Sequence, residues 1–594
     1  MASRHSRATI HLILRFMRQE PGSSVGRRAG DCNGRDVRWT PQTKRDRRDL
    51  LYPLASCAAL LFCVLIASPY ANSGFVDDWS YSRVALDFAR TGRIHYNGWG
   101  SPTLLFQALW ASAWIRLFGF SFDLLRNITL PFSCGFVMLV YALGRSAGLR
   151  YTLALFGSLL VATSPLFVPM AASFMTDPYG CFFTAGCIYA AVKTILSSRS
   201  RTQISWLWAL AVLGILGGSD RQTVWVAPLS LIPYLAWKCR SRVFRIHALM
   251  AISLCVACLV ALFYHFRPPY AGFHLDLRQF TVLFLREFAM ASGRMLGLFL
   301  TCAMLAAPAL VLLWPKWRQI GSARLLISVL GSIAGALLLA AAFGHVAVAP
   351  FVGDILSPYG VLLQGEDMLG LRTAVLPVWL RVAITAIVLL LTTLTLMVWR
   401  KLPASEQSQP MAIFAVFTLC SVPPLLPGAL LNLTYDRYVL PILPLIVITV
   451  LRRFQTMQLR TPILAWTLIG AFGCYSIATT HDYYARLKAR SSLAQTLVQA
   501  GIPSERVSAG FEPDGWARLE RTGHIASVKY GGEAPGNASD TFWFWYFAKI
   551  NPTHVVYYSE QDPHAKLQRS FRPWLSPTKK GFVFVGHRAH LGVR

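Results

Sequence analysis

The sequence predicts an all-α polytopic membrane protein with about thirteen transmembrane helices, followed by a small extracytoplasmic α/β domain. Hydrophobic residues make up 54% of the 594 residues and charged residues only 14%, whereas a water-soluble chain carries roughly a quarter charged residues. Many apolar runs are about 20 residues long, which is the length that crosses a hydrocarbon core of roughly 30 Å. The composition becomes polar after residue 480, which indicates a separate last domain.

Basic residues gather in alternate short connections between the apolar runs. In a soluble protein a net charge of +30 would favour nucleic acid as a partner. The alternate placement is instead typical of cytoplasmic loops under the positive-inside rule, so we expect membrane lipid and no nucleic acid as a partner. The basic connections hold Arg145 and Arg150; Lys193, Arg199 and Arg201; Lys238, Arg240, Arg242 and Arg245; Lys316, Arg318 and Arg324; Arg400 and Lys401; and Arg452, Arg453 and Arg460.

The apolar runs and their basic flanks predict the order of the spans. Residues 1–50 are rich in Arg and Gly and are expected to form a disordered basic cytoplasmic tail. An odd number of spans then leaves the N-terminus in the cytoplasm and residues 480–594 outside, in a membrane that we expect to be a bacterial inner membrane. The predicted spans are 51–70, 126–144, 151–170, 179–196, 205–218, 223–237, 246–264, 295–314, 324–343, 376–399, 411–431, 438–451 and 462–479.

Two long segments lie outside the membrane in this topology. The first is the loop 71–125, in which Trp79–Arg90 and Thr103–Phe118 are amphipathic, carry aromatic residues and are predicted to form interfacial helices. The second is the C-terminal segment, where the short apolar runs Thr553–Tyr558 and Gly581–Val585 suit strands. These strands predict the small α/β domain.

Ionisable residues collect where the predicted spans reach the extracytoplasmic face. A charge beside hydrocarbon costs a few kcal/mol, so such a residue usually has a function or a partner. All of these residues fall on one side of the membrane, which indicates a single site there. The four clusters are Asp77 with Asp78, Asp177, Asp220 with Arg221, and Asp436 with Arg437.

The three carboxylates Asp77, Asp78 and Asp177 are candidate catalytic residues, and each has a structural alternative. Asp78 can cap the helix that follows it, which leaves Asp77 free to face a substrate. Asp177 precedes Pro178, a residue that suits the first turn of the next helix, so Asp177 can be a cap as well.

The two arginines also have two interpretations. Arg221 and Arg437 can pair with the aspartates beside them at a helix end. Alternatively, an always-charged, bidentate donor at the membrane interface can hold a lipid phosphate. We find no cluster with metal-ligand spacing in the sequence and therefore predict no metal site, although dependence on a divalent metal stays open.

Three motifs of these residues resemble one family. They are Asp77-Asp78-Trp79-Ser80-Tyr81, Thr176-Asp177-Pro178 and Asp436-Arg437-Tyr438-Val439-Leu440-Pro441. Together they resemble the GT-C superfamily of polyprenyl-phosphate-sugar-dependent glycosyltransferases, in the group of protein mannosyltransferases, lipid A aminoarabinose transferases and rhizobial-type galacturonosyltransferases. By this resemblance, residues 51–265 are expected to form the GT-C-like catalytic transmembrane module and residues 266–479 a variable transmembrane module.

The resemblance implies an activity and roles for the candidate residues. A sugar on a polyprenyl phosphate would pass, with inversion, to an extracytoplasmic hydroxyl of a glycolipid, lipopolysaccharide or protein. Asp77 would act as the base, and Asp177 would orient the acceptor or the base. Arg437, with Arg221 as a weaker candidate, would bind the donor phosphate. The scheme requires no cofactor, and the lipid-linked sugar is the donor substrate.

A polytopic transporter or lipid flippase is the alternative function. It would carry ionisable residues in the middle of its spans and broken helices in related halves. In this sequence the charges lie at span ends, which favours an enzyme. The sugar, the acceptor and the oligomeric state are left open by the sequence.

Overall fold

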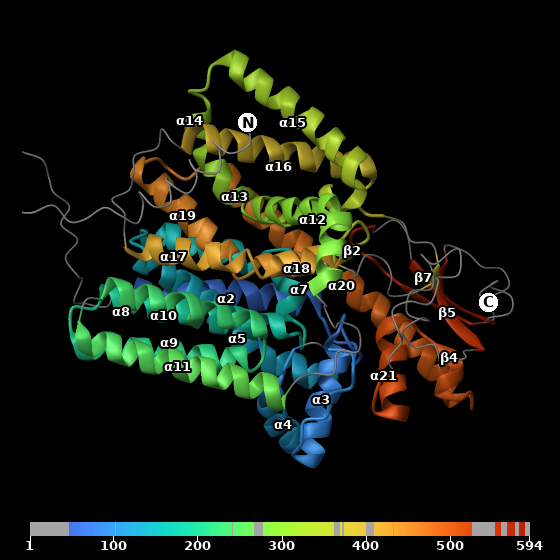
Figure 1. Ribbon diagram of the computed structural model, residues 1–594. Helices are drawn as coiled ribbons and strands as arrows, with labels where there is room; N and C mark the ends of the chain where they lie inside the picture. The colour runs from blue at the N-terminus through green and yellow to red at the C-terminus, as the bar shows by residue number, and fades with distance from the viewer. Residues whose placement is uncertain are drawn as a thin grey trace, which may run out of the picture. The chain divides into compact units, whose positions relative to one another are not determined.

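The computed structural model describes residues 47–100, 102–239, 241–266, 277–361, 369–370, 374–399, 409–431, 433–525, 553–559, 567–576 and 581–587. The expected basic tail lies, up to residue 46, outside the described residues, and its last residues belong to the first helix. The described part is built mainly of helices, with a small sheet near the C-terminus (Figure 1).

Helices joined by short connections make up the first half of the described chain (Figure 1). Outside the first loop, they are α2 (Arg48–Ala67), α5 (Phe122–Ser146), α6 (Tyr151–Ala162), α7 (Phe167–Ala171), α8 (Thr176–Leu196), α9 (Ser200–Gly218), the 3-10 helix η1 (Gln222–Trp225), α10 (Val226–Lys238) and α11 (Arg242–His265).

The second half continues this pattern with more short helices. Its helices are α12 (Leu277–Leu305), α13 (Ala307–Leu310), η2 (Val311–Leu313), α14 (Trp314–Trp317), α15 (Ser322–Phe343), η3 (Gly344–Ala347), α16 (Val378–Trp399), α17 (Gln409–Ser421), α18 (Leu425–Leu430), η4 (Asp436–Val439), α19 (Leu443–Thr456) and α20 (Ile463–Gln499).

The helices confirm a multi-pass membrane protein. Within the described ranges, nine helical segments are long and apolar enough to cross a membrane. The outermost of them expose apolar side chains, such as Leu249 of α11 and Leu338 of α15, as expected for a surface that faces lipid. The expected number of about thirteen spans stays a prediction, because several expected spans form shorter helices.

Prolines explain two of the breaks. The expected span 151–170 is divided into α6 and α7 around Pro165, and the expected span 411–431 into α17 and α18 around Pro423 and Pro424. Proline lacks the N–H that continues a helix, and its ring collides with the preceding turn.

The first loop forms the two helices that its amphipathic pattern predicts. They are α3 (Asp78–Thr91) and α4 (Leu105–Phe118), each within two residues of the expected bounds. The end of α3 is a left-handed Gly92, the usual way to terminate a helix. Arg116 of α4 donates a hydrogen bond to the carbonyl oxygen of Ala89, which ties the two helices together.

The C-terminal domain contains a mixed sheet and the helix α21 (Phe511–Thr522). The central strand β5 (His554–Ser559) pairs antiparallel with β7 (Gly581–His587), and both lie where the sequence predicts strands. On the other side of β7, β6 (Gln568–Phe571) is antiparallel. The parallel strands β3 (Leu369–Gly370) and β4 (Val507–Ser508) share the remaining edge of β5.

Two connections join this domain to the membrane part. Helix α20 crosses the expected boundary at residue 480 without a break, so the C-terminal domain is continuous with the last membrane helix (Figure 1). Strand β3 comes from the loop between α15 and α16, within the segment 266–479 that the sequence analysis assigned to the membrane. The sheet is therefore not built from the C-terminal segment alone.

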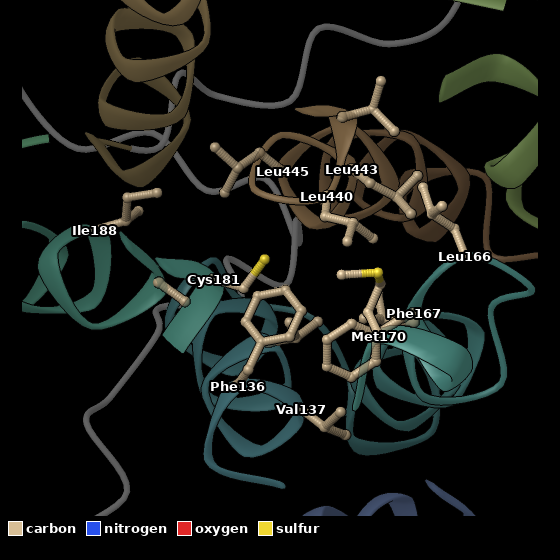
Figure 2. Close-up of a cluster of buried hydrophobic side chains, with 14 of the residues drawn as sticks. Phe136, Val137, Leu166, Phe167, Met170, Cys181, Ile188, Leu440, Leu443 and Leu445 are labelled. Atoms are coloured by element: carbon tan, nitrogen blue, oxygen red, sulfur yellow. The ribbon is translucent and has the colours of Figure 1, made fainter. Parts of the chain in front are cut away.

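A buried apolar core fixes the positions of the helices that carry the candidate residues. Figure 2 shows Phe136 of α5, Phe167 of α7 and Cys181 of α8 near Leu440, which follows η4, and Leu443, the first residue of α19. All five side chains are nearly inaccessible to solvent. This packing holds the start of α8 and the residues before α19 in fixed relation.

Candidate active site

Arg437 lies at the centre of three carboxylates. It belongs to the short helix η4, and its side chain is only 7% exposed. Its Nη1 lies 2.7 Å from Oδ2 of Asp354, its Nη2 lies 3.4 Å from Oδ2 of Asp77, and its Nε lies 3.9 Å from Oδ2 of Asp177. A planar guanidinium group with five N–H donors can address three acidic groups at once, which a lysine ammonium cannot do in the same geometry.

Arg221 supplies a second cation beside the first. It precedes η1, and its Nη1 lies 2.8 Å from Oδ2 of Asp177 and 2.7 Å from Oγ1 of Thr176. The oxygen of Asp177 that pairs with Arg221 is also the one that faces Arg437. Asp177 therefore lies between two guanidinium groups that come from distant parts of the chain.

The aspartates next to these arginines serve as anchors to other segments. Asp436 accepts hydrogen bonds from the backbone N–H groups of Ile355 and Leu356, at 3.3 and 2.7 Å. Asp220 accepts one from the N–H of Gln107, at 3.3 Å. Burial raises the pKa of Asp436 to about 6 and that of Asp220 to about 8, against the opposing effect of these N–H donors.

The arginines are thus not paired with the aspartates that precede them in the sequence. The contacts of the Asp436 carboxylate fix the backbone from which the Arg437 side chain extends, and the Asp220 carboxylate ties η1 to α4. The partners of Arg221 and Arg437 come from α8, from the first loop and from the loop before α16.

Asp77 is the most accessible carboxylate of the three around Arg437, with 18% of its side chain exposed. It is the residue before α3, but its side chain makes no capping hydrogen bond to that helix. One oxygen, Oδ1, accepts a hydrogen bond of 2.9 Å from Nε1 of Trp99, and the other faces Arg437. The carboxylate is thus directed away from its own helix.

Asp78 does not join this group. It is 1% exposed, and its carboxylate accepts hydrogen bonds from the backbone N–H groups of Phe75 and Phe174 instead of capping α3. The alternative in which Asp78 caps α3 is therefore wrong. Its carboxylate instead fixes the backbone at Phe75 and Phe174. Burial raises its pKa to about 7, partly offset by the nearby positive charge of Arg126.

A cavity of about 280 Å³ opens from the two arginines. Its polar end is formed by Asp177, Arg221 and Arg437. Away from them the walls come from α8, α10, α17, α18 and the start of α19, and most of the side chains there are apolar. They include Cys181, Val226, Phe417, Leu425, Leu431 and Ile442. The cavity thus joins a cationic end to a hydrocarbon-lined interior.

The acidic groups around Arg437 outnumber the basic ones. Two guanidinium groups face the carboxyl groups of Asp77, Asp177 and Asp354. Burial raises the pKa of Asp354 well above its ordinary range, and Asp436, Asp77 and Asp177 raise it further against the opposing effect of Arg437. A protonated Asp354 would leave the carboxylates of Asp77 and Asp177 in contact with the two guanidinium groups, which favours an anion as the ligand.

Within the described residues, no three His, Cys, Asp or Glu side chains are grouped as metal ligands would be. The described acidic groups of the site are separated by guanidinium groups, which repel a cation.

The structure brings four of the five predicted site residues together: Asp77, Asp177, Arg221 and Arg437. Asp78 is directed elsewhere. The sequence analysis missed Asp354, which approaches Arg437 more closely than the other carboxylates do. Its signal was present, because the loop between the expected spans 324–343 and 376–399 lies on the same side as the other acidic clusters.

No protein-family model matches the chain, and no curated protein matches its sequence. Solved structures do match. One is the Saccharomyces cerevisiae protein O-mannosyltransferase Pmt1-Pmt2 complex bound to the sugar donor, with 18% identity and a TM-score of 0.32. That match spans 38% of this chain and only 34% of the yeast chain.

Two further matches are crystal structures of ArnT from Cupriavidus metallidurans. The one bound to undecaprenyl phosphate has 11% identity and a TM-score of 0.39, and the one in the apo state has 13% and 0.37. Each match covers 90% of this chain and 97% of the other. With scores in this range, the function of the chain has to be inferred from the geometry of its own site.

Proposed function

We propose that this chain is a membrane glycosyltransferase that moves a sugar from a polyprenyl phosphate to an extracytoplasmic hydroxyl, with inversion at C1. One observation carries the proposal. The buried guanidinium group of Arg437 and the largely buried one of Arg221 stand at the polar end of a largely apolar cavity, and a partly exposed carboxylate contacts Arg437. A lipid phosphate, its hydrocarbon chain and a reacting hydroxyl need these three features side by side.

Arg437 and Arg221 are the proposed phosphate ligands. Both extend toward Asp177, so the two guanidinium groups are close enough for one anion to contact both. Arginine binds phosphate with parallel N–H donors, and such charge-assisted hydrogen bonds are about twice as strong as neutral ones. Asp177 would keep the two groups aligned, and the apolar walls of the cavity would hold the first isoprenoid units of the donor.

Asp77 is the proposed base. As the acceptor oxygen bonds to C1 of the sugar, the bond between C1 and the phosphate oxygen breaks. The bonding electrons leave with the phosphate, where Arg437 and Arg221 stabilise the charge. The hydroxyl proton passes to the Asp77 carboxylate, a role that its partial exposure and its contact with Arg437 support.

The acceptor is an alcohol on a glycolipid, a lipopolysaccharide or a protein. The partial exposure of Asp77 supports an acceptor that enters from the water-facing side, while the donor enters from the membrane. The same side of the protein carries the C-terminal domain, which packs against α3 next to Asp77.

The direct test is an assay of sugar transfer. Purified protein would be given a radiolabelled polyprenyl-phosphate sugar with an envelope extract as acceptor, and the products would be separated by chromatography. Transfer that disappears in Asp77→Asn supports the proposal.

The alternative of a transporter or flippase is tested in parallel. The same purified protein in proteoliposomes would be assayed for uptake of the labelled compound. Uptake without transfer would refute the glycosyltransferase and favour the alternative, because an enzyme of this kind need not move its donor across the bilayer.

A further inference from the structure

We propose that Trp99 is a positioning residue for Asp77 and that the C-terminal domain holds Trp99 in place. This inference rests on the proposed function, in which Asp77 is the base. It gives the C-terminal domain a part in the reaction itself, in addition to any part in acceptor binding.

The indole of Trp99 determines how the Asp77 carboxylate points. Its Nε1–H donates a hydrogen bond of 2.9 Å to Oδ1, while Oδ2 lies 3.4 Å from Nη2 of Arg437. The two oxygens are therefore held by two different groups. Asp77 makes no capping hydrogen bond that would fix its side chain against α3. The indole and Arg437 together therefore fix the orientation of the carboxylate.

The Trp99 ring cannot turn away easily, because it packs against two other rings. Its centroid lies 5.5 Å from that of Trp79 and 5.3 Å from that of Phe511. Phe511 is the first residue of α21 and is 1% exposed. Aromatic pairs at such distances add about 0.5–1.5 kcal/mol to the burial of their surface. One of the two supports of the indole thus belongs to the C-terminal domain.

The backbone around Trp99 is fastened to the same domain. The carbonyl oxygen of Asn97 accepts a hydrogen bond of 2.7 Å from the N–H of Ile525, just after α21. The Asn97 side-chain oxygen accepts from the backbone N–H of Trp99 at 3.2 Å and from the hydroxyl of Ser80 at 2.9 Å. This asparagine links α3, the Trp99 loop and the C-terminal domain.

Gly98 allows the close approach that this link requires. Its φ is +83°, a conformation that other residues avoid. A Cβ atom added there would lie 2.5 Å from the ring of His524, which follows α21. The loop that carries Trp99 and the residues after α21 therefore approach closely at Gly98, where an added side chain would have to displace the His524 ring.

Positioning of this kind affects turnover more than binding. A base displaced by a fraction of an ångström loses its alignment with the hydroxyl, whereas the phosphate ligands stay where they are. The contacts of Arg437 with Asp354 and of Arg221 with Asp177 do not involve Trp99. Loss of the indole N–H should therefore lower kcat and leave the KM for the lipid donor unchanged.

The experiment compares Trp99→Phe with Trp516→Phe in the full-length protein. Trp99→Phe keeps an aromatic ring next to Phe511 but removes the N–H donor, and kcat should fall at least about 10-fold, the lower end of the effect of one hydrogen bond to a charged group. Trp516 stacks on Phe120 in the same interface, with centroids 5.3 Å apart, so Trp516→Phe makes the matched change away from Asp77. It should leave kcat within about twofold of the unmodified protein.

A double variant separates positioning from general weakening of the fold. If Trp99 acts through Asp77, Trp99→Phe should have no further effect on kcat in the Asp77→Asn protein. An equal loss in both backgrounds would overturn the inference, as would equal effects of Trp99→Phe and Trp516→Phe.

Phe511→Leu tests the contribution of the domain. It should lower kcat in the same direction as Trp99→Phe, with the donor KM unchanged, and an unchanged kcat would refute the role of the domain. If Asp77→Asn itself retains full transfer, it is the assignment of the base in the proposed function that fails. If Asp77→Asn is inactive but Trp99→Phe is not impaired, only the present inference fails.

Discussion

Replacing Arg437 by lysine and by alanine should weaken the binding of a polyprenyl phosphate in two distinct steps. The guanidinium group addresses three carboxyl groups, at 2.7, 3.4 and 3.9 Å. A phosphate bound there gains charge-assisted hydrogen bonds, each of which contributes about 1.5–3 kcal/mol. Loss of one such bond changes Kd by about 10- to 150-fold.

Lysine keeps the charge but has no planar fork, so one ammonium group cannot serve Asp354 and a phosphate in the same geometry. We expect a Kd for Arg437→Lys about 10-fold above that of the unmodified protein, and one for Arg437→Ala at least about 100-fold above it. The alanine variant also leaves the carboxylates without the cation that separates them, which adds to the repulsion of the donor.

The assay is titration calorimetry of detergent-purified protein with a polyprenyl monophosphate that carries no sugar. Arg452→Ala is the matched control. Arg452 lies on α19 away from the cavity lining and donates a hydrogen bond of 3.0 Å to the carbonyl oxygen of Gly148. Thermal melting of each variant checks that it is folded. Binding by Arg437→Ala that equals binding by the unmodified protein would refute the phosphate role, and full binding by Arg437→Lys would refute the need for a bidentate donor.

Asp77→Asn should leave binding of the lipid phosphate intact and lower single-turnover transfer by about 10²- to 10⁴-fold, and a full transfer rate would contradict this expectation. Asp78→Asn should act mainly on the melting temperature, since the Asp78 carboxylate accepts hydrogen bonds from two backbone N–H groups. Because the pKa of Asp354 is raised and its protonated form favours an anion, affinity for the donor should decline as the pH rises through that pKa, and Asp354→Asn should abolish this dependence in titrations at several pH values. Cysteine labels after Thr480 should react with an impermeant reagent from outside and labels near Lys238 should not, and the reverse pattern would place the carboxylates in the cytoplasm.

Much of the site could be predicted because its residues follow a simple physical rule. A charge at the edge of hydrocarbon needs a partner, and the positive-inside pattern sorts such charges by side. That rule selected seven residues in four clusters, and the structure brings four of them, Asp77, Asp177, Arg221 and Arg437, within 4 Å of one another in pairs.

What could not be predicted depends on contacts between distant segments. Arg437 pairs with carboxylates 83, 260 and 360 positions away in the sequence and not with the neighbouring Asp436. The Asp436 carboxylate accepts hydrogen bonds from backbone N–H groups of another loop instead. The same holds for β3, a two-residue strand that joins the sheet of the C-terminal domain from the loop before α16. A strand so short leaves no alternation in the sequence.

The orientation of adjacent carboxylates is the other limit. Asp77 and Asp78 are indistinguishable by residue type, and the sequence analysis allowed both as catalytic residues. The start of α3 separates them: the first faces Trp99 and Arg437, while the second turns inward to Phe75 and Phe174. The residue at which α3 begins determines which of the two carboxylates faces Arg437, and packing sets where a helix begins.

In the proposed reaction, the carboxylate of Asp77 next to Arg437 takes a proton while a sugar leaves a lipid phosphate. The measurement that tests it most directly is transfer of label from a radiolabelled polyprenyl-phosphate sugar, in one turnover, by the unmodified protein and by Asp77→Asn at equal donor occupancy. We expect rapid transfer by the unmodified protein and transfer slower by about 10²- to 10⁴-fold by Asp77→Asn. Equal rates at equal occupancy, or no transfer by the unmodified protein with any envelope acceptor, would contradict it.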